Sequence, residues 1–544
     1  MTATAVEALG AAAHAVEHHL GRLVSDQVAS RLFDRDATLW GPEAEPEASV
    51  RLGWVGLHRA SRPLVGEVEA LREELRGRGV DRIVLCGMGG SSLAPEVICA
   101  TAGVELVVLD SSHPDMVRSA VTTGLERTAV VVSSKSGSTV ETDSQRRAFV
   151  AAFEDAGIDP TERIVVVTDP GSPLDERSRA DGYRVVNADP EVGGRYSALT
   201  AFGLVPSGLA GADIATLLDE AEEVADLLAQ DDAANPGLRL GAALAGTDPL
   251  RDKLVFTDAG SPLVGLADWA EQLIAESTGK QGAGLLPVVV PSGARLPSSL
   301  LDASDVTVVA LGGGDDEADL VPSTSVASQV NVTGPLGAQL LLWEVATAVA
   351  GRLLGINPFD QPDVESAKTA ARSLMEAGGT DTADPQAVDG AVQIRTEGGA
   401  WADGVTDLHG ALQALLEQLD PDSGYLSVMV YLDRVAHAGL EQVAPTLTVR
   451  TGRPVTFGWG PRFLHSTGQL HKGGPASGVY LQVTDTPEQD LPVPGTELTF
   501  GRLIAAQAAG DARVLGEQGR PVLRLHLTGA RGLEQVRAAL ESGS

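Results

Sequence analysis

Cysteine, lysine and positive charge are all scarce in this chain of 544 residues. With only Cys86 and Cys99, the chain can form neither a disulfide framework nor a four-cysteine zinc site. The 40 basic residues face 74 acidic residues, which gives a net charge of −34 and argues against nucleic acids and anionic membranes as partners. The shortage of cysteine is compatible with a reducing cytoplasm, where we expect the protein to reside.

Long apolar runs are also lacking. The longest, 336–355, is interrupted by polar and charged residues that include Glu344 and Arg352, so we predict a buried helix of a soluble protein and no membrane span. The N-terminal stretch, 1–23, has neither a basic start nor an unbroken apolar core. It therefore predicts an amphipathic helix and no export signal.

Lysine supplies only five of the 40 basic residues, and four of the five stand in short segments dense in Gly, Ser, Thr or Pro. Chance and a biased composition explain this pattern as well as a functional interpretation does. In the functional interpretation, a compact ammonium is placed where a phosphate or a proton is handled.

Short apolar runs alternate with helical segments, which predicts an α/β fold with parallel sheets covered by helices on both faces. We expect two such sandwiches and a C-terminal α/β domain. Strands are predicted at 105–111, 163–169, 183–189, 253–259, 285–291, 306–312, 426–432 and 520–527, with two more around 81–86 and 129–133. The predicted divisions are an N-terminal helical segment, 1–75, a first unit, 76–215, a second unit, 216–380, a linker, 381–403, and the C-terminal domain, 404–544.

A polar loop rich in glycine and serine, Gly87-Met88-Gly89-Gly90-Ser91-Ser92, follows the first predicted strand and opens a helix. In an open parallel sheet, ligands bind at the carboxyl ends of the strands. Glycines let the backbone approach an anion, and the helix N-terminus favours negative charge. The loop is neither the dinucleotide fingerprint nor a Walker A loop, so it favours a phosphate monoester that is held without magnesium.

A second polar loop follows another predicted strand of the same sheet. It combines hydroxyl groups, one ammonium and one glycine in Ser134, Lys135, Ser136, Gly137, Ser138 and Thr139. A capped turn between a strand and a helix would look similar to either loop taken alone. Two such loops in one sheet favour phosphosugar binding.

A glutamate is predicted on the buried face of a helix at 264–277. There, Leu266, Trp269 and Leu273 form an apolar stripe at helical spacing, and Glu276 falls within it. A desolvated carboxylate suits a general base. The alternative is a glutamate whose side chain turns to solvent at the end of the helix.

Lys368 falls on a second apolar stripe, formed by Val364, Ala371 and Met375 on a helix that Pro362 opens. A lysine on a buried face needs a partner or a chemical role. The alternative is a side chain that keeps its charged end in solvent.

Five segments carry a resemblance to a known family. GMGGSSL (87–93) and SSKSGSTVET (133–142) resemble the sugar isomerase (SIS) phosphosugar-binding fold. VGGRYSALTAFG (192–203), AESTGK (275–280) and GINPFDQPDVESAK (355–368) narrow the resemblance to the glucose-6-phosphate isomerase family. It covers roughly 50–380, while 404–544 resembles the tail of the actinobacterial and transaldolase-fused forms.

The resemblance implies that Gly90, Ser91 and the 134–139 loop hold the phosphate of a hexose 6-phosphate and that Gln272 contacts the substrate. It also implies a homodimer with a shared active site and no metal or organic cofactor. The sequence itself contains no HExxH motif, no clustered Cys and His ligands and no nucleotide fingerprint.

The resemblance also implies catalytic roles. Glu276 moves a proton between C1 and C2, and Lys368 takes part in opening the sugar ring. Arg195, which follows the Gly193-Gly194 turn, stabilises the negative charge of the enediolate. From the residues alone, Arg195 is equally compatible with an ordinary arginine at a helix start.

The sequence departs from the family at one point. Members of the family place a catalytic histidine between the glutamate and the INPFDQP segment, yet no histidine occurs between Glu276 and Lys368. A glycine-rich segment, 458–478, holds two histidines. We expect His465 to supply the missing imidazole, with His471 as the second candidate; otherwise both serve turns, and ring opening uses Lys368 and water.

The predicted function is therefore the reversible conversion of glucose 6-phosphate to fructose 6-phosphate through a cis-enediolate. Three alternatives remain open. A non-catalytic phosphosugar regulator that binds DNA is opposed by the net charge of −34. An amidotransferase-type isomerase needs an N-terminal cysteine nucleophile, which neither cysteine supplies. Activity on mannose 6-phosphate depends on the shape of the pocket, which the sequence does not reveal.

Overall fold

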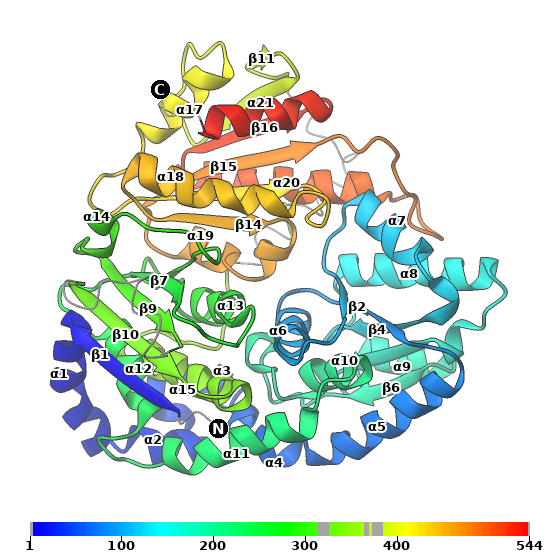
Figure 1. Ribbon diagram of the computed structural model, residues 1–544, viewed down its shortest axis with the longest axis horizontal. Helices are drawn as coiled ribbons and strands as arrows, with labels where there is room; N and C mark the ends of the chain where they lie inside the picture. The colour runs from blue at the N-terminus through cyan, green and yellow to red at the C-terminus, as the bar shows by residue number, and fades with distance from the viewer. Residues whose placement is uncertain (1–3, 313–325, 364–368, 371, 373–383, 542–544) are drawn as a thin grey trace.

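The computed structural model describes residues 4–312, 326–363, 369, 370, 372 and 384–541. Three sheets organise this part of the chain (Figure 1). The α/β class predicted from the sequence is confirmed, since each sheet consists mainly of parallel strands with helices packed around it.

The first sheet is fully parallel and has the order β3-β2-β4-β5-β6. Every residue of β2, β4 and β5 is buried, because helices cover both faces and the strands therefore have no polar side. Its strands are β2 (Arg82–Cys86), β3 (Val107–Leu109), β4 (Thr128–Ser133), β5 (Ile164–Thr168) and β6 (Arg184–Asn187). Its helices are α5 (Arg62–Gly77), α6 (Leu93–Ala102), α7 (Pro114–Thr122), α8 (Val140–Asp155), α9 (Pro173–Ala180) and α10 (Ala201–Ala210).

The second sheet has the order β8-β7-β9-β10-β1, and its first four strands repeat the order β3-β2-β4-β5 of the first sheet. Its strands are β7 (Lys253–Asp258), β8 (Leu286–Val289), β9 (Val306–Leu311), β10 (Ser328–Thr333) and β1 (Ala5–Gly10). Its helices are α1 (Ala11–Ser25), α11 (Ile214–Leu228), α12 (Pro236–Ala245), α13 (Leu266–Thr278), α14 (Ser298–Leu301) and α15 (Leu336–Leu354). Short helices α2 (Val28–Phe33), α3 (Glu45–Ala48) and α4 (Leu57–Ala60) connect the N-terminal region to α5.

The third sheet has the order β11-β12-β16-β15-β13-β14 and belongs to the C-terminal block, 384–541. Its last four strands are parallel, and β11 and β12 add to it antiparallel. Its strands are β11 (Ala387–Asp389), β12 (Val392–Glu397), β13 (Tyr425–Tyr431), β14 (Val455–Trp459), β15 (Gly478–Asp485) and β16 (Val522–Leu527). Its helices are α17 (Leu408–Leu416), α18 (Val443–Thr451), α19 (Gly468–Gly473), α20 (Phe500–Glu517) and α21 (Ala530–Glu541).

One local prediction is right only in part, and another is wrong. The helix predicted at 1–23 is confirmed from Ala11 onward as α1, but a strand precedes it: Ala5–Gly10 pairs antiparallel with β10 and so satisfies the backbone groups of that edge. The predicted linker, 381–403, contributes β11 and β12, which meet at a turn where Gly390 has a φ of 57°. Ala5–Gly10 and β12 find partners far away in the sequence, in β10 and β16, which local composition does not encode.

The buried helix predicted at 336–355 is confirmed as α15, whose residues from Leu336 to Gly351 are all buried. It packs against α11, α12 and α13 in the core. None of the helices in the described part of the chain combines the length and the apolar character that a membrane span requires.

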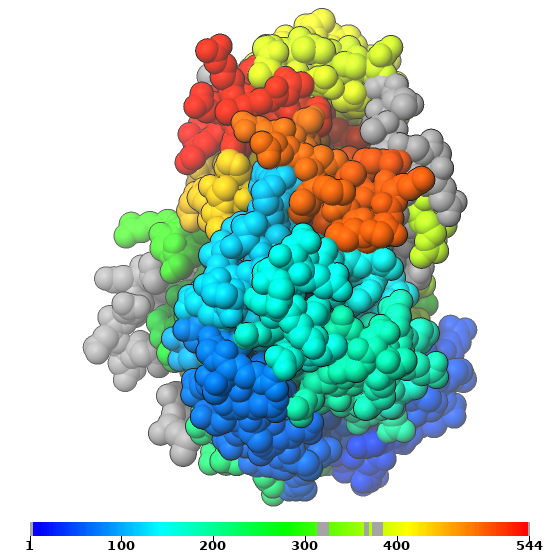
Figure 2. Space-filling view, turned by 90° about the vertical axis from the view of Figure 1, so that its right-hand side faces the viewer, coloured from blue at the N-terminus to red at the C-terminus, as the bar shows by residue number. Residues whose placement is uncertain are grey.

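Charged side chains join the C-terminal block to the other two units. Arg453, which precedes β14, forms an ion pair with Asp305, and Asp305 also pairs with Lys253 (3.3 Å). Figure 2 shows the orange part of the C-terminal block seated on the cyan part of the first unit, where Arg118 donates to the carbonyl oxygen of Gln489 (2.6 Å). These contacts hold the block in place, so its loops can contribute to a site between the units.

Two glycines allow a direct test of the helix packing. A Cβ added at Gly337 would lie 1.9 Å from the carbonyl oxygen of Leu217, whereas one added at the exposed Gly66 in α5 meets nothing within 4 Å. We expect Gly337→Ala to lower the free energy of unfolding by about 1–3 kcal/mol through overpacking. Gly66→Ala should raise it by about 0.5–1 kcal/mol through helix propensity. Urea unfolding of both variants checks the prediction, and equal midpoints would contradict it.

Candidate active site

The first glycine-rich loop makes close contact with three other parts of the molecule. It forms the turn Gly89–Ser91 between β2 and α6. A Cβ at Gly89 would lie 2.8 Å from both Nε2 of Gln272 and the carbonyl oxygen of His465. A Cβ at Gly90 would lie 2.0 Å from the carbonyl oxygen of Gly194. The absence of side chains at these positions is therefore what brings the loop against α13, the Arg195 turn and the C-terminal block.

The second loop, 134–139, leaves the carboxyl end of β4, which is adjacent to β2 in the sheet. Ser134 Oγ accepts a hydrogen bond from the N–H of Gly137 (3.1 Å), where φ is 75°. The hydroxyl groups of Ser136 and Ser138 lie 2.7 Å apart on the exposed side of the loop. Thr139 precedes the first residue of α8, so hydroxyl groups and a helix N-terminus face the same edge.

Lys135 does not point toward these hydroxyl groups. Its ammonium pairs with Asp169 (2.7 Å) and donates to the carbonyl oxygen of Val192 (2.9 Å). Burial raises the pKa of the Asp169 carboxyl, and the nearby Lys135 ammonium offsets part of this rise. Lys135 thus braces the segment that leads into the Gly193-Gly194 turn and Arg195.

Arg195 is 3% exposed and lies in a short turn, Gly194–Tyr196. Its guanidinium donates to Ser277 Oγ (2.8 Å), to Gln361 Oε1 (2.9 Å) and to the carbonyl oxygen of Pro358 (2.7 Å). It also lies 3.4 Å from Oε1 of Glu276. One buried cation therefore connects α13 with the segment after α15.

Glu276 is 7% exposed and lies on the buried face of α13, as the apolar stripe predicts. Its Oε2 accepts a hydrogen bond from Nε2 of Gln272 (3.1 Å), one turn earlier on the helix. The same nitrogen donates to the carbonyl oxygen of His465 (2.6 Å). Glu276 is thus held between the Arg195 guanidinium and a fixed amide, close to the first loop.

A buried lysine supports the other side of this group. Nζ of Lys280 donates to the carbonyl oxygen of Asn357 (2.8 Å) and to the carboxylate of Asp360 (2.7 Å). Burial and the nearby Arg195 charge lower the pKa of Lys280 to about 8. Lys280 and Arg195 together fix the turn at 357–361. Lys368, which follows this turn in the sequence, lies outside the described residues.

His465 reaches the site from the C-terminal block. Its Nε2 lies 3.0 Å from Oε1 of Glu141, in the first turn of α8 after the second loop. Just before it in the sequence, Arg462 forms ion pairs with Asp110 (2.9 Å) and Glu96 of the first unit. Arg462 and Glu96 thereby dock the turn that carries His465.

His471 lies elsewhere. It is 1% exposed, and its ring packs among three aromatic rings, those of Tyr425, Phe463 and Tyr480. Burial, with the charge of Lys472, holds the pKa of His471 well below its usual value. An imidazole in this environment stays neutral and belongs to the core of the C-terminal block.

The structure thus brings together Gly90, Arg195, Gln272, Glu276 and His465, but not His471. Sequence reasoning missed four residues around them. Glu141 and Lys280 lie inside the quoted segments SSKSGSTVET and AESTGK, and Gln361 lies in INPFDQP, so their signal was present. Gln507, which contacts Glu141, has no local signal of any kind.

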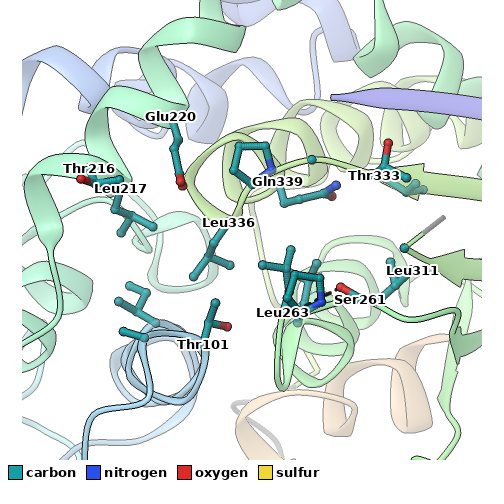
Figure 3. A pocket seen from close by; sticks show the side chains of 18 of the residues that line it. Thr101, Thr216, Leu217, Glu220, Ser261, Leu263, Leu311, Thr333, Leu336 and Gln339 are labelled. Atoms are coloured by element: carbon teal, nitrogen blue, oxygen red, sulfur yellow. Dashed lines mark hydrogen bonds between the residues drawn. The ribbon is translucent and has the colours of Figure 1, made fainter. Parts of the chain in front are cut away.

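A separate cavity of about 560 Å³ lies at the carboxyl ends of β9 and β10 (Figure 3). Leu217, Leu263 and Leu336 supply apolar walls, and the carboxylate of Glu220 faces it from α11. No lysine or arginine occurs among the described residues that line it. Its charge is therefore unsuited to a phosphate, and the grouping around Glu276 is the better candidate.

Known proteins with similar sequences include sugar-phosphate isomerases. No family model matches the chain. The "Probable glucose-6-phosphate isomerase" of Natronomonas pharaonis is 32% identical over 414 residues, which cover 67% of this chain and 94% of that protein. The "Glucose-6-phosphate isomerase" of Rubrobacter xylanophilus is 29% identical over 398 residues, covering 59% and 89%. The crystal structure of a hypothetical protein from Thermus thermophilus superposes with a TM-score of 0.55 at 25% identity, covering 68% of this chain and 100% of that one.

Two glycines test the close approach of the first loop to the Arg195 turn. A Cβ at Gly90 would collide with the carbonyl oxygen of Gly194, whereas a Cβ at Gly194 meets nothing within 4 Å. We expect Gly90→Ala to weaken the binding of a hexose phosphate by about tenfold or more, because relieving the overlap costs about 1–3 kcal/mol. Gly194→Ala is the matched control and should bind normally. Calorimetry measures both dissociation constants, and equal values would contradict the prediction.

Proposed function

The chain belongs to the glucose-6-phosphate isomerase family, and we propose that it interconverts glucose 6-phosphate and fructose 6-phosphate through a cis-enediolate. It is an aldose–ketose isomerase of glycolysis and gluconeogenesis. The observation that carries the proposal is the buried Glu276 carboxylate, 3.4 Å from the Arg195 guanidinium and next to the glycine-rich loop. A base beside a cation is what proton transfer between two neighbouring carbons requires.

The proposed phosphate site uses both loops of the first sheet. Gly90 offers its backbone N–H group and Ser91 its hydroxyl group ahead of α6, and Ser134, Ser136, Ser138 and Thr139 offer hydroxyl groups ahead of α8. Two helix N-termini favour the same anion. In this proposal, Lys135 acts from behind the loop by holding the carbonyl of Val192.

The proposed isomerisation is one proton transfer in two halves. Glu276 removes the proton from C2, and the electron pair passes through the C1–C2 bond to the carbonyl oxygen at C1, giving the enediolate. Arg195 stabilises the oxygen anion, and its position next to Glu276 also compensates the buried carboxylate. The hydroxyl proton at O2 passes to O1, and Glu276 returns the carbon-bound proton to C1, so that C2 becomes the carbonyl carbon of the ketose. Gln272 keeps the carboxylate in place through its hydrogen bond to Oε2.

Ring opening needs a separate proton-transfer group, since a hexose 6-phosphate in water is mainly a cyclic hemiacetal. We propose that His465 fills this role. Its Nε2 contacts Glu141, which leaves Nδ1 for the sugar. Lys368 is proposed as the second group from the family resemblance, and it lies outside the described residues.

The physiological form is proposed to be a cytoplasmic homodimer. The support is the shortage of cysteine and the family resemblance. The Glu141–His465 pair belongs to a single chain, so a dimer would not need to exchange this histidine. Sedimentation equilibrium at micromolar concentration tests the dimer.

Glu276→Gln tests the proposed function. Removing the base while keeping the shape should lower kcat by at least about 10³-fold, within the range of general-base catalysis, with little change in the binding of 5-phosphoarabinonate. The control is Glu271→Gln on the same helix, because burial raises the pKa of Glu271 to about 8 and its side chain is already neutral at pH 7. A coupled assay for fructose 6-phosphate conversion measures both. Similar turnover in Glu276→Gln and the native enzyme would refute the role of Glu276.

The two histidines can be separated in the Glu276→Gln background. That variant stops isomerisation, so the exchange between the α and β anomers of glucose 6-phosphate reports ring opening alone. We expect His465→Gln to slow the catalysed exchange by about 10–100-fold, as general acid–base catalysis contributes at least that much. His471→Gln should leave it within about threefold, since His471 is neutral and buried away from the site. Exchange NMR gives the rates, and the reverse ranking would overturn the assignment.

A further inference from the structure

Gln507 reaches the Glu141–His465 pair from α20, more than 350 residues after Glu141 in the sequence. Its Nε2 donates to Oε1 of Glu141 (2.6 Å), the oxygen that also contacts His465 (3.0 Å). Its own Oε1 accepts a hydrogen bond from the hydroxyl group of Ser112 (2.6 Å). Gln507, Glu141 and Ser112 are 5%, 4% and 0% exposed, so bulk water does not replace these bonds.

The partners of the Gln507 side chain fix the direction of its amide group. If the amide were flipped, its oxygen would face the carboxylate of Glu141 at hydrogen-bond distance, and two acceptors would repel each other. The observed direction therefore suits an ionised Glu141, whose oxygens only accept hydrogen bonds. With an amide N–H already directed at Oε1, the carboxylate accepts, and the hydrogen of the His465 imidazole lies on Nε2. Nδ1 is then the atom that exchanges a proton with the sugar.

Neighbouring hydrogen bonds keep Gln507 in one position. Ser112 follows β3, where Gln145 of α8 donates to the carbonyl oxygen of Ser111 (3.0 Å). Gln145 lies one turn after Glu141 on the same helix. This hydrogen-bonded series therefore links four separate segments, each of which is anchored elsewhere. Its members are Ser112, Gln507, Glu141 and His465. The ion pairs of Arg434 and Arg462 dock the C-terminal block independently of Gln507.

We propose that Gln507 is a positioning residue that keeps Glu141 ionised and His465 in the tautomer required for ring opening. The inference rests on the proposed function, because it acts through His465. Gln507 makes no contact with the sugar in this scheme. The C-terminal block thus supplies both the histidine and the group that sets its proton state.

Two substitutions separate this role from simple packing. Gln507→Met keeps the length and removes the donor, and we expect ring opening to slow by about tenfold or more at every pH, as expected for losing a hydrogen bond to a charged group. Gln507→Glu keeps the shape and places a second carboxyl beside Glu141. Two carboxyls at one site share a proton, so the new group can donate to Glu141 at low pH and repels it once ionised.

The expected profile for Gln507→Glu is therefore near-native ring opening at low pH that falls as pH rises. Anomer exchange of glucose 6-phosphate in the Glu276→Gln background measures it between pH 5 and about 9. Gln518→Met, at the exposed end of α20, is the control and should be neutral. The dissociation constant for 5-phosphoarabinonate, expected to be unchanged, shows that each variant is folded.

The proposal is overturned if Gln507→Met opens the ring within about twofold of the parent rate, or if Gln507→Glu loses the same factor at all pH values. Loss of 5-phosphoarabinonate binding in both variants would assign Gln507 to the fold and also overturn it. Failure of the proposed function looks different, because the native enzyme would then form no fructose 6-phosphate.

Discussion

The site depends on the need to satisfy one buried guanidinium. Arg195 is almost fully enclosed, and a guanidinium carries five N–H donors that cannot be deprotonated. Its partners come from α13 and from the turn at 358–361, and one of its neighbours is the Glu276 carboxylate. Moving any of these segments would leave a charge without a partner, which is far more costly than a lost contact between neutral groups. Loops of three separate origins are therefore held in one arrangement.

The C-terminal block completes this arrangement with further buried charges. Arg434 and Arg462 both pair with Asp110, which is fully buried, and both contact Glu96. Arginine suits these positions because its planar fork can bind two carboxylates at once. The Glu96 carboxylate is held in its ionised form, with its pKa lowered to about 2 by the two arginines against the effect of burial. This rigid contact carries the turn that ends at His465.

Much of the fold and part of the site could be predicted from the sequence. Most buried strands of the first two sheets were visible as runs of β-branched residues, although β10 (Ser328–Thr333) was not predicted, and Glu276 was visible on its apolar stripe. The strand at Ala5–Gly10 was not, because its alanines favour a helix and its partner, β10, lies over 300 residues away. The choice between His465 and His471 depends on which ring is enclosed by Tyr425 and Tyr480, a three-dimensional fact. The rare lysines prove largely structural: each described one pairs with an aspartate, namely Lys135 with Asp169, Lys253 with Asp305, Lys280 with Asp360 and Lys472 with Asp511.

The placement of His465 and Gln507 late in the chain has a consequence for how the enzyme matures on the ribosome. The phosphate loops, Arg195 and Glu276 emerge first, and the block that carries the histidine is translated last. In the proposed mechanism, a chain that lacks this block would lack both His465, the group that opens the ring, and Gln507, which contacts Glu141.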